Sequence, residues 1–140
     1  MNFLSQIKQR AASRRRTIVL PESQDPRVLE AAATLSRDRL VRVILVADEH
    51  TMEQAGMDGK LDLSAVEMSN AATHPAIEDF AYEFYELRKS KGVDREQARR
   101  LISQPLYFAA MLVRQGEADG MVAGSLATSG EVIKSALHIL

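Results

Sequence analysis

Residues 119–139, DGMVAGSLATSGEVIKSALHI, decide the fold class because strand, loop and helix signals follow one another without a break. We expect a buried strand over 119–123, a loop over 124–128 and a final helix capped by Ser129. The apolar stripe of this helix would consist of Val132, Ile133, Ala136, Leu137 and Leu140. A strand that leads through a short loop into a helix is the repeating unit of α/β proteins with parallel sheets.

The same alternation of strand and helix continues through the rest of the chain. Apolar and β-branched runs predict strands over 17–20 and 41–47, and a weaker strand over 65–68. Capping residues and prolines predict helices that begin near Asn2, Asp25, Glu49, Pro75, Asp94 and Pro105. This order predicts one α/β domain over residues 1–140, in which helices cover both faces of a mostly parallel sheet in three layers.

Composition narrows the classes of partner and setting. Of the 140 residues, 46% are hydrophobic and 26% are charged, the net charge is −1, and cysteine is absent. This charge balance argues against binding to nucleic acid or to an anionic membrane. The lack of cysteine excludes disulfides, thiol nucleophiles and thiolate metal sites within these residues. Because no apolar run could span a bilayer and no secretory signal is visible, we expect a cytoplasmic protein.

One basic cluster could contact a ligand. Arg88, Lys89 and Lys91 lie at the end of a predicted helix, where they either complement the helix dipole or contact a phosphate group. We expect no metal site, because the acidic cluster with a histidine at residues 48–50 suits a helix start better than a set of ligands.

The loop after the last strand is the second candidate. It holds Gly124, Ser125 and Thr128 and leads into a helix start, whose free backbone N–H groups can bind an anion. Parallel sheets also place ligands at the ends of their strands. The alternative is a plain connecting loop, in which Ser129 serves only to cap the helix.

Three segments, in this order, resemble one known family. They are TIVLPESQDPRVLEAA at 17–32, YEFYELRKSKGV at 82–93 and ADGMVAGSLATSGEVIKSALHI at 118–139. Together they resemble the phosphate acetyl/butyryltransferase family, and most closely its acetyl-transferring members, the phosphate acetyltransferases. The resemblance covers nearly the whole chain and corresponds to the N-terminal portion of the family's proteins.

The resemblance implies an activity and an architecture. The implied reaction is acetyl-CoA plus phosphate giving acetyl phosphate plus CoA, with coenzyme A as a substrate and no further cofactor. The implied fold is that of isocitrate and isopropylmalate dehydrogenases, in which the active site lies between two domains of a homodimeric enzyme used in acetate metabolism. This chain would be most of the first domain, and the proposed general base would lie beyond residue 140. The apolar stripe that still runs at Leu140 also predicts a truncated chain.

The resemblance also implies site residues. Arg88 falls on the family's arginine and would bind phosphate or the phosphates of CoA. Thr128 falls on its loop serine or threonine and would act in catalysis, while Gly124, Ser125 and Ser129 would help to hold the acyl phosphate. Lys134 stands where the family often has arginine, with Ser135 in place of proline and Ala127 in place of histidine. A lysine lacks the bidentate fork of arginine, so the acyl group could be acetyl, propionyl or butyryl.

A second hypothesis has a different function class. Domains of this family also occur fused to malic enzymes, where they bind acetyl-CoA as regulatory modules without catalysis. A chain that starts at Met1 with its own helix is expected to argue against such a fusion.

Overall fold

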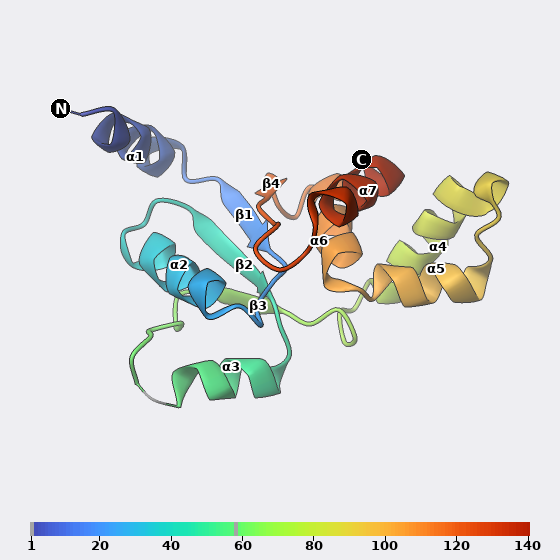
Figure 1. The fold of residues 1–140 in the computed structure, drawn as a ribbon, viewed down its shortest axis with the longest axis horizontal. Coiled ribbons are helices and arrows are strands. Elements are labelled where there is room, and N and C mark those ends of the chain that lie inside the picture. Colours follow the sequence, from blue (N-terminus) through green and yellow to red (C-terminus); the bar gives the residue numbers. More distant parts are fainter. Residues whose placement is uncertain (1, 58) are drawn as a thin grey trace.

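The computed structural model describes residues 2–57 and 59–140, which alternate between helices and short strands (Figure 1). The strands are β1 (Thr17–Leu20), β2 (Arg42–Val46), β3 (Glu67–Ser69) and β4 (Gly120–Met121). The helices are α1 (Phe3–Arg14), α2 (Pro26–Arg37), α3 (Glu49–Gly56), α4 (Ile77–Arg88), η1 (Lys89–Lys91, a 3-10 turn), α5 (Arg95–Ile102), α6 (Pro105–Arg114) and α7 (Ser129–Ile139). The predicted order of elements is confirmed.

The four strands form one parallel sheet in the order β3-β2-β1-β4, which confirms the predicted fold class. The chain builds outward from β1 to β2 and β3, and then crosses to the opposite side of β1 to add β4. The sheet therefore has its topological switch point between β1 and β4. In open α/β sheets, ligands bind at such a point, outside the carboxyl ends of the strands.

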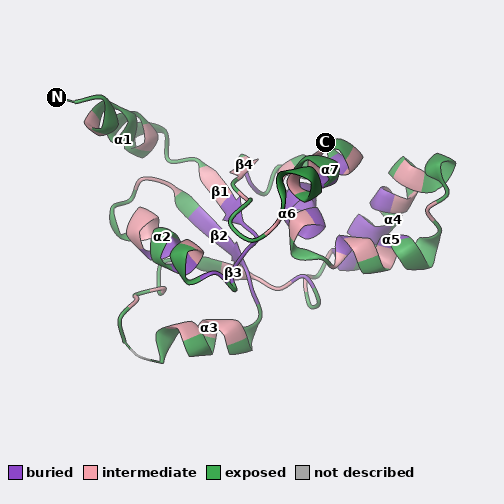
Figure 2. Cartoon of the chain, viewed as in Figure 1, coloured by how far each residue is buried: buried purple, intermediate pink, exposed green. Residues whose placement is uncertain are grey.

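Successive residues of the strands face opposite sides of the sheet and build two separate cores. Leu20, Val43 and Leu45 pack with α2 in one buried cluster. Val19, Ile44 and Val46 belong to the other cluster, which is larger and includes the buried faces of α4, α5 and α6. Of these helices, α6 lies directly against β1 and β4, and α4 and α5 extend away from the sheet beside it (Figures 1 and 2).

Local capping signals explain where most helices begin. Asn2, Asp25 and Asp48 each accept a backbone hydrogen bond as N-caps, and Asp94 forms the predicted capping box. The prediction that Pro75 begins α4 is wrong. A turn precedes this helix instead, because the Ala76 amide donates to the His74 ring at 3.1 Å, and the first helical residue is Ile77.

Two predictions about the last unit of the fold also need correction. Strand β4 has two residues rather than five, because the Val122 amide is the last to donate to β1 and the amides from Gly124 onward turn toward another acceptor. Ser129 is not the cap of α7 but its first residue. Thr128 is the cap: its hydroxyl accepts from the Glu131 amide, and the Glu131 carboxylate accepts from the Thr128 amide.

The apolar stripe of α7 is only partly buried. Ile139 is buried, whereas Ile133, Leu137 and Leu140 are exposed. Helix α1 has no buried residue and lies apart from the sheet in Figure 1. Among the described helices, none combines the length and apolar character needed to cross a membrane.

Candidate functional site

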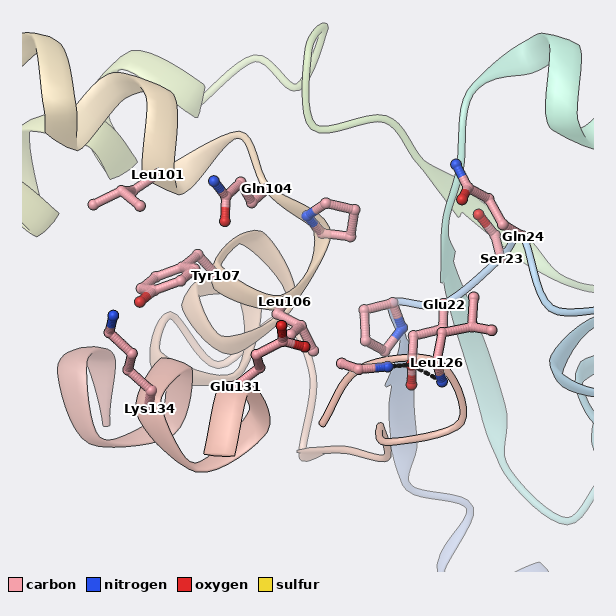
Figure 3. Close-up of a pocket in the computed structure, with 13 residues that line it drawn as sticks. Glu22, Ser23, Gln24, Leu101, Gln104, Leu106, Tyr107, Leu126, Glu131 and Lys134 are labelled. Carbon is pink, nitrogen blue, oxygen red and sulfur yellow. Dashed lines mark hydrogen bonds between the residues drawn. The ribbon is translucent and has the colours of Figure 1, made fainter. Parts of the chain in front are cut away.

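A cavity of about 550 Å³ lies at the switch point of the sheet (Figure 3). Its walls come from the segment after β1, the junction of α5 and α6, the loop after β4, and the first turns of α7. The lining residues are Pro21, Glu22, Ser23, Gln24, Leu101, Gln104, Pro105, Leu106, Tyr107, Leu126, Ala127, Glu131 and Lys134. This size is typical of cavities that hold small ligands.

One wall of the cavity is held by the carboxylate of Glu22. Its Oε1 accepts from the backbone amides of Gly124 at 2.6 Å and Ser125 at 3.1 Å. Its Oε2 accepts from those of Leu126 at 2.6 Å and Ala127 at 2.8 Å (Figure 3). We call this arrangement the Glu22 clamp. Burial alone would raise the pKa of Glu22, but the four N–H donors outweigh it and hold that pKa below its ordinary value.

The clamp changes what the loop after β4 can offer a ligand. The amides of Gly124 and Ser125, which the sequence suggested for an acyl phosphate, already donate to Glu22. Gly124 has φ 114°, a conformation that favours glycine and that turns successive amides toward one side. The Ser125 carbonyl is held as well, since it accepts from Arg27 at 3.2 Å. The backbone amides of this loop therefore form a site for an anion, and a carboxylate of the same chain already occupies it.

Thr128 and Ser129 lie at the start of α7 without forming the cavity wall. The lining passes from Ala127 directly to Glu131, one turn further along. The Thr128 hydroxyl caps the helix and both residues are exposed. Their predicted roles in holding or activating an acyl phosphate stay predictions. Both residues lie at the end of the loop, beside the cavity rather than within it.

Of the predicted site residues, Lys134 lines the cavity. Arg88 does not line the cavity but is connected to its wall through two contacts. The Arg88 Nη2 atom is 3.3 Å from Nε2 of His138, and His138 Nδ1 is 3.2 Å from the hydroxyl of Tyr107, which lines the cavity. Burial lowers the pKa of His138, and the positive charges of Arg88 and Lys134 lower it further. The structure thus brings Arg88 and Lys134 to the same end of the cavity.

The sequence did not single out Glu22, Tyr107 or His138 as site residues. Glu22 lies two residues after the end of β1, and neighbouring parallel strands end at the same edge of a sheet, which was the available signal for its contact with the loop after β4. For Tyr107 and His138 no local signal existed, because their contact joins residues 31 apart on different helices. Among the described residues, no three His, Cys, Asp or Glu side chains gather as a metal site would need.

Comparison with known proteins identifies the family of this chain. Residues 2–140 match the family described as phosphate acetyl/butaryl transferase. The phosphate acetyltransferase of Acetivibrio thermocellus is 43% identical over the whole chain, which spans 42% of that relative, and the one of Synechocystis is 41% identical, with 20% of its length spanned.

Solved structures give the same result for the fold. A phosphotransacetylase from Staphylococcus aureus matches 97% of the chain with a TM-score of 0.85 and 35% identity. One from Streptococcus pyogenes matches the whole chain with a TM-score of 0.90 and 26% identity. The chain spans 41% and 43% of these two proteins. Because the family match covers nearly every residue, the chain belongs to the phosphate acetyl/butaryl transferase family.

Proposed function

We propose that this chain is part of an acyltransferase that moves an acetyl group reversibly between coenzyme A and inorganic phosphate. The observation that carries the proposal is the alignment of the whole chain with relatives named phosphate acetyltransferase. The cavity at the carboxyl ends of β1 and β4 supports it, since this is where an α/β sheet of this topology binds small ligands.

The proposed reaction sets clear chemical demands. The sulfur of CoA attacks the carbonyl carbon of acetyl phosphate, a tetrahedral oxyanion forms, and the bond from carbon to the phosphate oxygen breaks as phosphate leaves. The thiol proton must pass to a base, and the oxyanion and the leaving phosphate need cations or hydrogen-bond donors. The products are acetyl-CoA and phosphate, and the reverse sequence makes acetyl phosphate.

The described residues supply the second kind of group. Lys134 gives the cavity an ammonium group, and Arg88 adds positive charge from behind Tyr107. Thr128 and Ser129 stand at the first turn of α7, where the Glu131 amide is taken by the cap and the Ser129 and Gly130 amides are left for a ligand. Glu22 is a poor base, because four N–H donors stabilise its charged form. We therefore place the general base on residues outside this chain, in agreement with the greater length of the relatives.

Coenzyme A, acetyl-CoA, acetyl phosphate and phosphate are the proposed small-molecule partners, within acetate metabolism in the cytoplasm. We propose a homodimer for the complete enzyme. The exposed apolar side chains of α7 support further burial of this face, because large apolar surfaces rarely stay open to water without a partner.

A direct assay tests the proposed activity. The complete gene product is given acetyl-, propionyl- or butyryl-CoA with and without phosphate, and released thiol is measured. We expect phosphate-dependent release, fastest with acetyl-CoA, and no turnover by residues 1–140 alone. Binding of acetyl-CoA without any phosphate-dependent release would refute the proposal and favour a regulatory acyl-CoA-binding domain. Robust turnover by residues 1–140 would show that the base lies within this chain.

A further inference from the structure

Three polar side chains from three helices form a row that ends in the cavity. Arg88 of α4 contacts His138 of α7 at 3.3 Å, and His138 contacts the hydroxyl of Tyr107 of α6 at 3.2 Å. Tyr107 is buried, with 7% of its surface exposed, and it lines the cavity. Figure 3 shows its hydroxyl and the end of the Lys134 side chain pointing toward one another.

Counting protons along this row fixes the state of His138. A guanidinium has only donors, so Nε2 of His138 must accept from Arg88 and carries no proton. The imidazole is therefore neutral and holds its proton on Nδ1, which donates to the Tyr107 oxygen. Its lowered pKa agrees with a neutral ring, because burial and the charges of Arg88 and Lys134 all oppose a second proton.

The same count leaves the hydroxyl proton of Tyr107 available. Its oxygen is the acceptor for His138, and within residues 2–57 and 59–140 it makes no other hydrogen bond. Lys134 cannot take this proton, since an ammonium has no acceptor. Burial also raises the pKa of Tyr107, so the hydroxyl keeps its proton. A buried donor hydrogen normally finds an acceptor, and because Tyr107 lines the cavity, a ligand there can supply one.

We propose that the Tyr107 hydroxyl donates a hydrogen bond to a phosphate oxygen that Lys134 also binds, and that Arg88 and His138 are positioning residues that fix the direction of this O–H group. Two donors at one end of a cavity suit a ligand that offers only acceptors, and phosphate oxygens are the strongest acceptors of this kind. Inorganic phosphate and acetyl phosphate share this chemistry. The inference deepens the proposed function but can be tested without turnover.

The protonation of His138 gives the most direct test. In a ¹⁵N–¹H spectrum of the histidine side chains at neutral pH, we expect His138 to be neutral with its proton on Nδ1. A proton on Nε2, or on both nitrogens, would overturn the positioning argument, because Arg88 and Nε2 would then present two donors to each other. This measurement uses the unchanged chain and does not depend on how any variant folds.

Binding measurements test the donor pair. Inorganic phosphate and acetyl phosphate are titrated separately by calorimetry against the wild-type chain, Tyr107→Phe and Lys134→Gln. A hydrogen bond to a charged group contributes about 1.5–3 kcal/mol, so Tyr107→Phe should weaken binding about ten- to a hundredfold. Tyr82→Phe is the matched control, because Tyr82 is exposed on α4 outside the cavity lining. Equal affinity in Tyr107→Phe and wild type for both ligands would refute the pairing.

Variants of His138 separate positioning from simple packing. His138→Gln keeps an oxygen that can accept from Arg88 and an amide that can donate to Tyr107, so we expect near wild-type phosphate affinity. His138→Leu fills the space without either group and should weaken binding severalfold. The reverse ranking would contradict the inference. If phosphate binds through Tyr107 but the complete gene product releases no CoA, the proposed function fails and this inference stands.

Discussion

Replacing Glu22 with glutamine tests whether the clamp holds the loop after β4. Glutamine keeps the size of the side chain but exchanges one acceptor oxygen for an NH₂ group. Two of the four backbone amides, which now donate at 2.6–3.1 Å, would then face another donor. An unsatisfied buried donor costs about 1–3 kcal/mol, and water can reach part of this loop, so we expect a loss of about 2–4 kcal/mol.

Thermal unfolding measures this loss. For 140 residues, an unfolding entropy of about 2.1 cal/mol/K per residue makes 1 kcal/mol equal to about 3–4 °C. Glu22→Gln should therefore lower Tm by about 7–14 °C. Glu30→Gln is the matched control, because Glu30 is exposed on α2, and it should leave Tm within about 2 °C of wild type. A Glu22→Gln protein that melts with the control would refute the view that the clamp stabilises the fold.

The pH dependence of stability gives a second readout of the clamp. The folded pKa of Glu22 lies below its ordinary value of 4.5, so the charged form is the one that the fold favours. Its contribution is therefore complete above pH 4.5 and is lost as pH falls through the folded pKa. Wild type should lose more stability than Glu22→Gln as pH falls below 4.5. Parallel curves for the two proteins would contradict this assignment.

Three further predictions concern other parts of the molecule. Thr128→Ala should cost about 1 kcal/mol by removing the cap of α7, and Thr128→Ser should recover most of it, as chemical denaturation will show. The folded pKa of Asp25 is about 2, below its ordinary value of 3.8, because its carboxylate accepts from Arg27. The stability that Asp25 adds is therefore present above pH 3.8 and lost toward pH 2. Asp25→Asn should remove this pH dependence of Tm, which thermal melts will measure. Arg88→Ala in the complete enzyme should raise KM for acetyl phosphate or CoA with an unchanged fold, which steady-state kinetics with a circular dichroism control will measure.

The features that the sequence predicted correctly depend on short-range rules. Asp25 before Pro26 begins α2, and Asp94 with Gln97 begins α5, because the groups that cap a helix lie within one turn of it. Even the error at Ser129 had a local signal against it, since Thr128 and Glu131 have the spacing of a capping box. The order of strands and helices follows from the same kind of pattern.

The features that the sequence did not predict depend on contacts across the fold. Glu22 meets its four amides about a hundred residues further along the chain, and no local motif around Glu22 indicates them; only the pairing of β1 with β4 brings the two segments together. Periodicity identified the apolar stripe of α7 but not what covers it, and two members of that stripe, Ile133 and Leu137, are exposed. Secondary structure depends on residues that are close together in the sequence. Which groups occupy a site depends instead on which strand ends come together in the fold.

The electrostatics of the cavity follow from the same contacts. The two carboxylates in its wall, those of Glu22 and Glu131, both accept from backbone amides, which offset their charge. Lys134 and Arg88, by contrast, have no carboxylate within salt-bridge distance in the described part of the chain. These contacts favour the binding of an anion in the cavity, although the net charge of the chain is −1.

This imbalance predicts that phosphate binding depends on salt. Because Lys134 is exposed, added ions screen its attraction for phosphate, and the Debye length falls from about 10 Å at 0.1 M to about 3 Å at 1 M ionic strength. Phosphate affinity should therefore fall as sodium chloride is raised, and the dependence should be weaker in Lys134→Gln than in Tyr107→Phe, which keeps the charge. Calorimetric titrations of both variants over this salt range make the comparison. Equal salt dependence in the two would show that the charge of Lys134 does not act on the bound anion.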